Sequence, residues 1–127
     1  MKKLLTLLFF ILTSMTAFSQ NVFLRANTFN IGYRADEKSE ITWSEPTSVN
    51  ILIKVEENKA TIFSKDIQIY RLISTSEKRE EYTKYYCTND EGKTCYILIF
   101  TLPESPGSVF FAIEFSDYVW YYITKPE

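Results

Sequence analysis

The sequence of 127 residues contains no histidine, only three glycines and only two methionines. Without histidine, the common catalytic dyads and triads are excluded, and an enzyme would need carboxylates, lysine or tyrosine instead. Two cysteines without histidine do not complete a tetrahedral zinc site, so we expect no metal. Both methionines, Met1 and Met15, lie near the N-terminus, so the rest of the chain must build its core from aromatic and β-branched side chains.

The sequence also lacks an apolar run of the roughly 20 residues that a membrane-spanning helix needs. Its most apolar segment, residues 4–12, follows two lysines and precedes small residues at 17–19 with the spacing that a signal peptidase cleaves. We therefore expect residues 1–19 to be a signal peptide. Residues 20–127 would then form a single β domain that is exported to the periplasm, the cell surface or the medium, with no integral membrane segment after cleavage.

Clustered positive charge is absent too. The formal net charge is −2, whereas nucleic acids and anionic lipids require a cationic face. We expect no nucleic-acid partner and, in the absence of any cofactor motif, no cofactor. The polar run at residues 89–92 lacks the alternate spacing of oxygen ligands in calcium loops, so we interpret it as a turn.

What the sequence does contain is a series of short segments in which apolar residues recur at every second position, the period of a half-buried strand. Residues 49–56 and 60–64 flank a two-residue turn, and pairing them places Ile53 opposite Ile62. Residues 74–81 contain no apolar side chain and are expected to form an exposed loop. Further strands are expected at residues 22–33, 40–43, 67–73, 83–87, 95–101, 109–115 and 118–124.

About eight short strands without a convincing helix indicate an all-β fold. We expect an antiparallel meander that closes into a small barrel or a two-sheet sandwich.

The near-palindrome YYCTNDEGKTCY, residues 85–96, predicts a β-hairpin. With Cys87 opposite Cys95, the loop has three residues and ends in Gly92, where the backbone must be left-handed. Directly opposed residues lie about 4.5 to 5.5 Å apart at Cα, within the reach of a disulfide. In an exported protein we expect a structural disulfide. A strained, redox-active bridge and a metal clip are the alternatives.

The C-terminal hairpin is apolar on both faces, and Glu114 is its lone charge. One face carries Tyr118, Trp120 and Tyr122, and the other carries Tyr121 with Glu114. Glu114 is a polar anchor in an apolar ligand pocket, a solubilising charge on a partly exposed strand, or one half of an ion pair with Arg71. The candidate binding residues are Tyr86, Tyr96, Glu114, Tyr118, Trp120, Tyr121 and Tyr122.

Four segments resemble short exported all-β proteins of Bacteroidota-type bacteria. These segments are the signal ending in SQ, the strand pair ATIFSKDIQIYRLI, the turn CTNDEGKTC and the ending EFSDYVWYYI. The resemblance implies export and an all-β fold, and it implies no activity and no site residues.

Together these features predict an exported, noncatalytic binding domain that uses an aromatic face to hold an apolar small molecule, a glycan or a protein. The alternative is a small inhibitor of a lysozyme or protease that acts through a rigid loop at residues 89–92 or 102–108. Catalysis by carboxylates is the third possibility.

Overall fold

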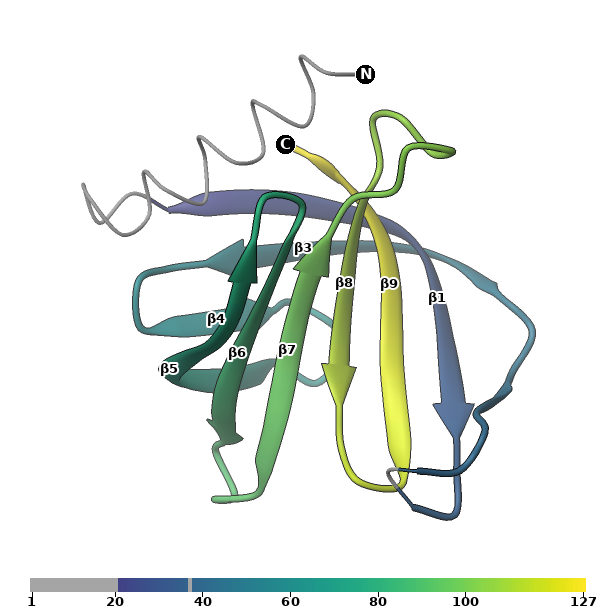
Figure 1. Ribbon diagram of the computed structural model, residues 1–127. Helices are drawn as coiled ribbons and strands as arrows, with labels where there is room; N and C mark the ends of the chain where they lie inside the picture. The colour runs from purple at the N-terminus through teal and green to yellow at the C-terminus, as the bar shows by residue number, and fades with distance from the viewer. Residues whose placement is uncertain (1–20, 37) are drawn as a thin grey trace.

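The computed structural model describes residues 21–36 and 38–127, so the expected signal peptide at residues 1–19 lies outside the described residues. The described chain is all β, with nine antiparallel strands (Figure 1). They are β1 (Val22–Tyr33), β2 (Thr42–Trp43), β3 (Thr47–Val55), β4 (Lys59–Ile62), β5 (Gln68–Arg79), β6 (Tyr82–Asn89), β7 (Thr94–Phe100), β8 (Val109–Glu114) and β9 (Tyr118–Pro126). Within this part of the chain, no helix has the length and apolar character needed to span a bilayer.

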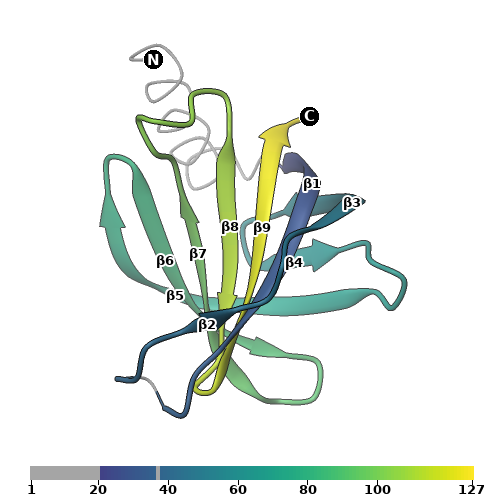
Figure 2. The same cartoon turned by 90° about the vertical axis from the view of Figure 1, so that its right-hand side faces the viewer.

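The strands form a closed barrel rather than a sandwich. Strands β3 to β9 pair in chain order, and β1 pairs with β3 along one edge and with β9 along the other. Figure 2 shows β1 beside β9 at this seam. The short strand β2 pairs with the end of β1 and stays outside the eight-stranded ring. Closure gives every barrel strand two neighbours, which removes the exposed sheet edges that would otherwise invite aggregation.

The interior of the barrel is filled by side chains from all eight strands. An eight-stranded barrel has an interior just wide enough for such packing. Its largest fully buried members include Leu24, Ile53, Ile62, Ile97, Ile113, Phe111 and Tyr122. Because this core occupies the middle of the barrel, a binding site has to lie at an end or on the outer wall.

The hairpins follow the sequence closely. Ile53 lies opposite Ile62 across β3 and β4, and Cys87 lies opposite Cys95 across β6 and β7. Gly92 closes the three-residue loop with a positive φ of 82°, as the turn chemistry predicts. Local pairing and turn chemistry were therefore sufficient to fix these registers.

The expected loop at residues 74–81 is wrong, because β5 continues as a strand to Arg79. Its second half is exposed on both faces and pairs with β6 through two register shifts, after Leu72 and after Thr75. A strand without a buried face needs no apolar residue, so the periodic signal is missing there. In its first half Tyr70 and Leu72 face the core, while Ile69 and Ile73 are exposed.

Candidate functional site

A row of aromatic rings starts beside the β8–β9 turn and belongs to or packs against the barrel core. This turn lies at the lower end of the barrel in Figure 1. This inner aromatic row consists of Phe115, Tyr118, Trp120, Phe29 and Tyr122. Successive ring centroids are 4.6, 6.4, 5.8 and 4.9 Å apart. Phe29 joins the row because β1 pairs with β9 and places it directly opposite Tyr122. The row thus depends on closure of the barrel.

Three members of this row, Phe29, Trp120 and Tyr122, line a pocket of about 410 Å³, the barrel-mouth pocket. Its apolar wall comes from three strands, β1, β3 and β9. Its polar rim comes from the β4–β5 connection, the start of β5 and the β6–β7 turn. The lining residues are Phe29, Ile31, Ile51, Trp120 and Tyr122 on the wall and Ser64, Lys65, Asp66, Gln68 and Glu91 on the rim. Apolar pockets with a few placed polar groups are the usual form of small-molecule sites.

Gln68 is held in one orientation by a chain of hydrogen bonds. The Tyr70 hydroxyl donates to Gln68 Oε1 at 2.6 Å, and Gln68 Nε2 donates to Ser64 Oγ at 3.1 Å. Ser64 Oγ in turn donates to the Asp66 carbonyl at 2.7 Å. The rim amide is therefore positioned before any ligand arrives.

The two phenols beside Gln68 stay neutral. Burial raises the pKa of Tyr70 well above its usual range. Burial also raises the pKa of Tyr122, to about 12, although a hydrogen bond with Gln68 partly opposes that rise. The charged side chains of the pocket are accordingly Lys65, Asp66 and Glu91.

Glu91 sits at the tip of the β6–β7 hairpin, in a turn that Asn89 stabilises. The Asn89 Oδ1 atom accepts hydrogen bonds from the backbone N–H of Glu91 at 3.0 Å and of Lys93 at 2.8 Å. An Asn side chain that mimics a backbone turn in this way is a common turn stabiliser. The rim carboxylate is thus carried on an ordered turn.

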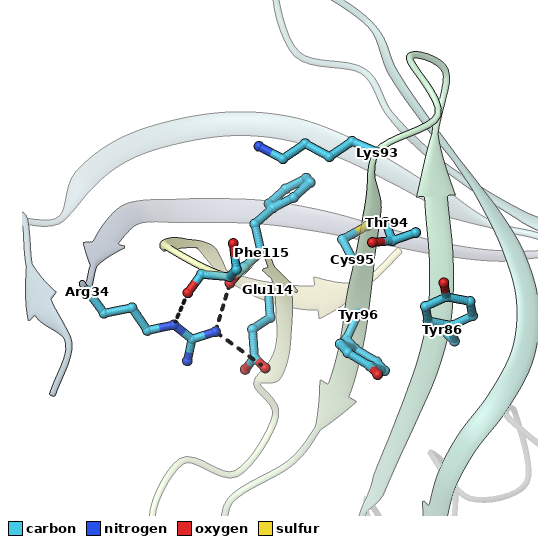
Figure 3. Close-up of a pocket in the computed structure, with 9 residues that line it drawn as sticks. Arg34, Tyr86, Lys93, Thr94, Cys95, Tyr96, Glu114 and Phe115 are labelled. Atoms are coloured by element: carbon cyan, nitrogen blue, oxygen red, sulfur yellow. Dashed lines mark hydrogen bonds and ion pairs between the residues drawn. The ribbon is translucent and has the colours of Figure 1, made fainter. Parts of the chain in front are cut away.

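Glu114 lies elsewhere, in an outer pocket of about 230 Å³ on the barrel wall (Figure 3). Its ion-pair partner is Arg34, at 3.7 Å, so the alternative of an ion pair with Arg71 is wrong. Arg71 lies on β5 opposite Lys59 and Thr88, whereas β1 ends close to Glu114 because it pairs with β9.

The Arg34 guanidinium lies closer to backbone carbonyl oxygens than to the Glu114 carboxylate. It donates to the carbonyl oxygens of Phe115 at 2.7 Å and Ser116 at 3.0 Å, with only 7% of its side chain exposed. These bonds hold the β8–β9 turn against the end of β1. Figure 3 shows the guanidinium between this turn and the Glu114 carboxylate. We therefore assign Arg34 and Glu114 to closure of the barrel.

The seven candidate binding residues occupy three separate places. Trp120 and Tyr122 line the barrel-mouth pocket, and Tyr118 stands next to Trp120 in the inner aromatic row. Tyr86, Tyr96 and Glu114 line the outer pocket. Tyr121 lies on the outer wall, with its ring 5.5 Å from Trp43 and 5.8 Å from Phe110. The structure therefore does not bring the seven residues together into one site.

Sequence reasoning missed most of the barrel-mouth pocket. Phe29 and Ile51 fell within predicted strands, but no local signal showed that β1 and β3 would stand beside the end of β9. Gln68 and Glu91 resembled ordinary polar residues next to turns. Knowledge of barrel closure was needed to find all four.

The two cysteines are buried free thiols in this structure, directly opposite each other. The Cys87 thiol donates to the Tyr85 carbonyl oxygen at 3.4 Å. The adjacent Cys95 thiol and burial raise the pKa of Cys87, whereas the Cys87 thiol lowers the pKa of Cys95. The register is the one expected for a disulfide, while the bond itself stays a prediction. Among the residues that the structure describes, no group of three or more metal-ligating side chains is gathered.

A scan against protein-family models finds no match, and neither a search of curated proteins nor a search of solved structures finds a similar protein. The resemblance to exported Bacteroidota-type proteins therefore stays a prediction, and function has to be argued from the site itself.

Proposed function

We propose that the protein is a noncatalytic binding domain that holds a small ligand in the barrel-mouth pocket. The single observation that carries the proposal is the group of three rings, Phe29, Trp120 and Tyr122, at the open end of a barrel that is otherwise filled. Trp120 and Phe29 are only partly buried, so their ring surfaces remain available to a ligand. Aromatic rings supply large, rigid contact area at a small cost in conformational entropy.

The shape of the pocket favours a small molecule over a protein. Its volume of about 410 Å³ falls in the range typical of small-ligand sites, and its polar groups are gathered along one rim. Tyr122, the phenol in the pocket lining, stays protonated at neutral pH because burial raises its pKa to about 12, so no phenolate is present there to act as a base. Binding without chemistry is the function that this arrangement supports best.

The inhibitor alternative has less support. One of its two candidate loops, residues 89–92, carries Glu91, which belongs to the rim of the barrel-mouth pocket. A loop that closes a pocket of its own protein is less suited to plugging another protein.

Export and a Cys87–Cys95 disulfide are part of the same proposal. Each thiol loses one hydrogen as the S–S bond forms, and two electrons and two protons pass to a disulfide oxidant such as oxidised glutathione. The directly opposed register on β6 and β7 supports this bridge. Intact mass spectrometry of the exported protein tests both points, since it should show loss of residues 1–19 and of two hydrogens. A full-length or fully reduced product would contradict them.

The binding proposal is tested by tryptophan fluorescence. Trp43 and Trp120 are the two tryptophans of the chain, so Trp43→Phe leaves Trp120 as the sole reporter in the pocket. Titration with cyclohexanol, octanoate, methyl glucoside and methyl galactoside should give a saturable change in Trp120 emission with at least one of these probes. If none of the four probes changes the emission, the proposal is overturned.

Two variants locate the site. Phe29→Ala removes a partly exposed wall of the pocket and should abolish the response in the Trp43→Phe background. Tyr121→Ala is the control, because Tyr121 lies on the opposite side of the barrel wall. Loss of binding in the Tyr121 variant with retention in the Phe29 variant would place the site on the outer wall and contradict the proposal.

A further inference from the structure

We propose that the ligand of the barrel-mouth pocket is a neutral hydroxylated ring, namely a monosaccharide or the terminal unit of a glycan. This inference rests on the proposed function and adds the chemical class of the ligand. It combines three features of the pocket: its depth, the balance of charge on its rim and the angle between its rings.

The depth excludes long apolar chains. At the back of the pocket, Tyr122 is 1% exposed, and Phe111, with its ring centroid 6.4 Å from that of Tyr122, is fully buried, so the barrel core begins there. A fatty acid or another extended chain would need a channel into the interior, and packed side chains occupy that space. A compact ligand that lies across the mouth fits the pocket without displacing the core.

The rim charges disfavour anions and favour hydroxyl groups. The rim carries two carboxylates, Asp66 and Glu91, and one ammonium group, Lys65. An anionic ligand would meet a surplus of negative charge. Ionised carboxylates only accept hydrogen bonds, so their natural partners are ligand donors such as hydroxyl groups.

The positioned amide extends this pattern. Gln68 accepts from the Tyr70 hydroxyl, donates to Ser64 Oγ and also hydrogen-bonds the Tyr122 phenol, which leaves one lone pair on Oε1. That lone pair can accept a hydrogen bond from a ligand hydroxyl group. Because the hydrogen-bond chain already fixes Gln68, a hydrogen bond between this side chain and a ligand costs little further side-chain entropy.

Two aromatic rings of the pocket form a corner into which a sugar ring fits. Phe29 and Trp120 meet edge to face, with an interplanar angle of 71°. One ring can therefore lie against the C–H face of a pyranose while the other touches its edge. A sugar has an apolar face and a polar perimeter, the same division that the pocket shows between its wall and its rim.

The experiment is saturation-transfer NMR on the exported protein. The neutral probes are glucose, galactose, mannose, xylose, N-acetylglucosamine and cellobiose, and the anionic and apolar comparisons are glucuronate, octanoate and indole. We expect saturation transfer to at least one neutral sugar, and we expect indole to compete with that sugar. Glucuronate should bind at least tenfold more weakly than glucose.

Two variants test the rim. Glu91→Gln replaces a charged acceptor with a neutral one and should weaken sugar binding about tenfold, since charge-assisted hydrogen bonds are the stronger kind. The matched control Glu104→Gln changes a carboxylate in the β7–β8 connection, away from the residues that line the pocket, and should leave binding unchanged.

The outcomes separate this inference from the proposed function. Binding of indole or octanoate without any sugar overturns the ligand class and leaves the binding function standing. Binding of none of the nine probes overturns both. Preference for glucuronate over glucose, or unchanged sugar binding in the Glu91→Gln variant, overturns the role given to the rim carboxylates.

Discussion

At the scale of single residues, the buried phenols of Tyr70 and Tyr122 make stability depend on alkaline pH. Burial raises the pKa of both, that of Tyr122 from 10.0 to about 12. Between these two values the native state holds a proton that the unfolded state has lost, so stability falls as pH rises. The stabilisation is fully present below pH 10, and Tyr122 contributes about 3 kcal/mol of it. Urea unfolding at pH 9, 10, 11 and 12 measures the loss.

The matched variants for this prediction are Tyr122→Phe and Tyr33→Phe. The first removes the buried ionisable group and should flatten part of the pH dependence above pH 10. Tyr33 is 56% exposed, so its variant should follow the parent protein. If both variants showed the parent's dependence, the Tyr122 phenol would not be the source.

A second residue-scale prediction concerns Gly32, where the segment before β3 crosses the outer wall. A Cβ atom at this position would lie 2.4 Å from Ile41 Cγ2 and 2.8 Å from Trp43 Cζ3. Gly32→Ala should therefore push this segment outward and cost roughly 1 to 3 kcal/mol, the usual range for overpacking. In a Trp120→Phe background, the emission of Trp43 should shift to longer wavelength. Unchanged emission and stability would show that the segment does not pack on Gly32.

At the scale of elements, the β6–β7 hairpin combines its own turn chemistry with the proposed disulfide. The bridge closes a short loop, so chain entropy predicts a gain of about 2 to 3 kcal/mol in the free energy of unfolding on oxidation. Denaturant unfolding of the oxidised and reduced protein measures this gain, with Cys87→Ser/Cys95→Ser as the reduced reference. A reduced protein as stable as the oxidised one would mean that the turn and the ladder suffice without the bridge.

At the scale of the whole molecule, stability depends on the seam between the first and last strands. Arg34 donates to two backbone carbonyls there, and its own N–H donates to Asp117 O at 3.0 Å. Arg34→Met keeps the backbone bond but leaves the carbonyls of Phe115 and Ser116 without their donor. We expect a loss of about 1 to 3 kcal/mol, the usual cost of a buried polar group without a partner, because the Phe115 carbonyl is partly buried whereas water can reach the exposed Ser116 carbonyl.

The variant to compare with Arg34→Met is Glu114→Gln. Its carboxylate is 27% exposed and lies 3.7 Å from Arg34, so its loss should cost no more than about 1 kcal/mol. Thermal unfolding of both variants, followed by circular dichroism and by fluorescence, should give coincident single transitions because closure involves every strand. A larger loss for Glu114→Gln than for Arg34→Met would reverse the roles assigned to the two residues.

The sequence predicted the local parts of this architecture well. The bounds of β1, the register of Ile53 with Ile62 and the hairpin at Gly92 all follow from period-two patterns and turn residues. The same signals failed for the second half of β5, which is exposed on both faces and so has no apolar period. They also failed to identify Arg34 as the partner of Glu114, because no local sequence pattern predicts that β1 pairs with β9.

What the sequence by itself determined was an all-β chain of short antiparallel strands, with Trp120 and Tyr122 on one face of the last hairpin. Apolar alternation and turn chemistry depend on residues that are close in the sequence, so both can be predicted from the sequence. Only the tertiary structure decided between barrel and sandwich, and only it brought Phe29, Gln68 and Glu91 to Trp120. These residues meet because pairing of β1 with β9 closes the ring, a contact between the two ends of the domain that depends on the summed twist and stagger of every strand between them.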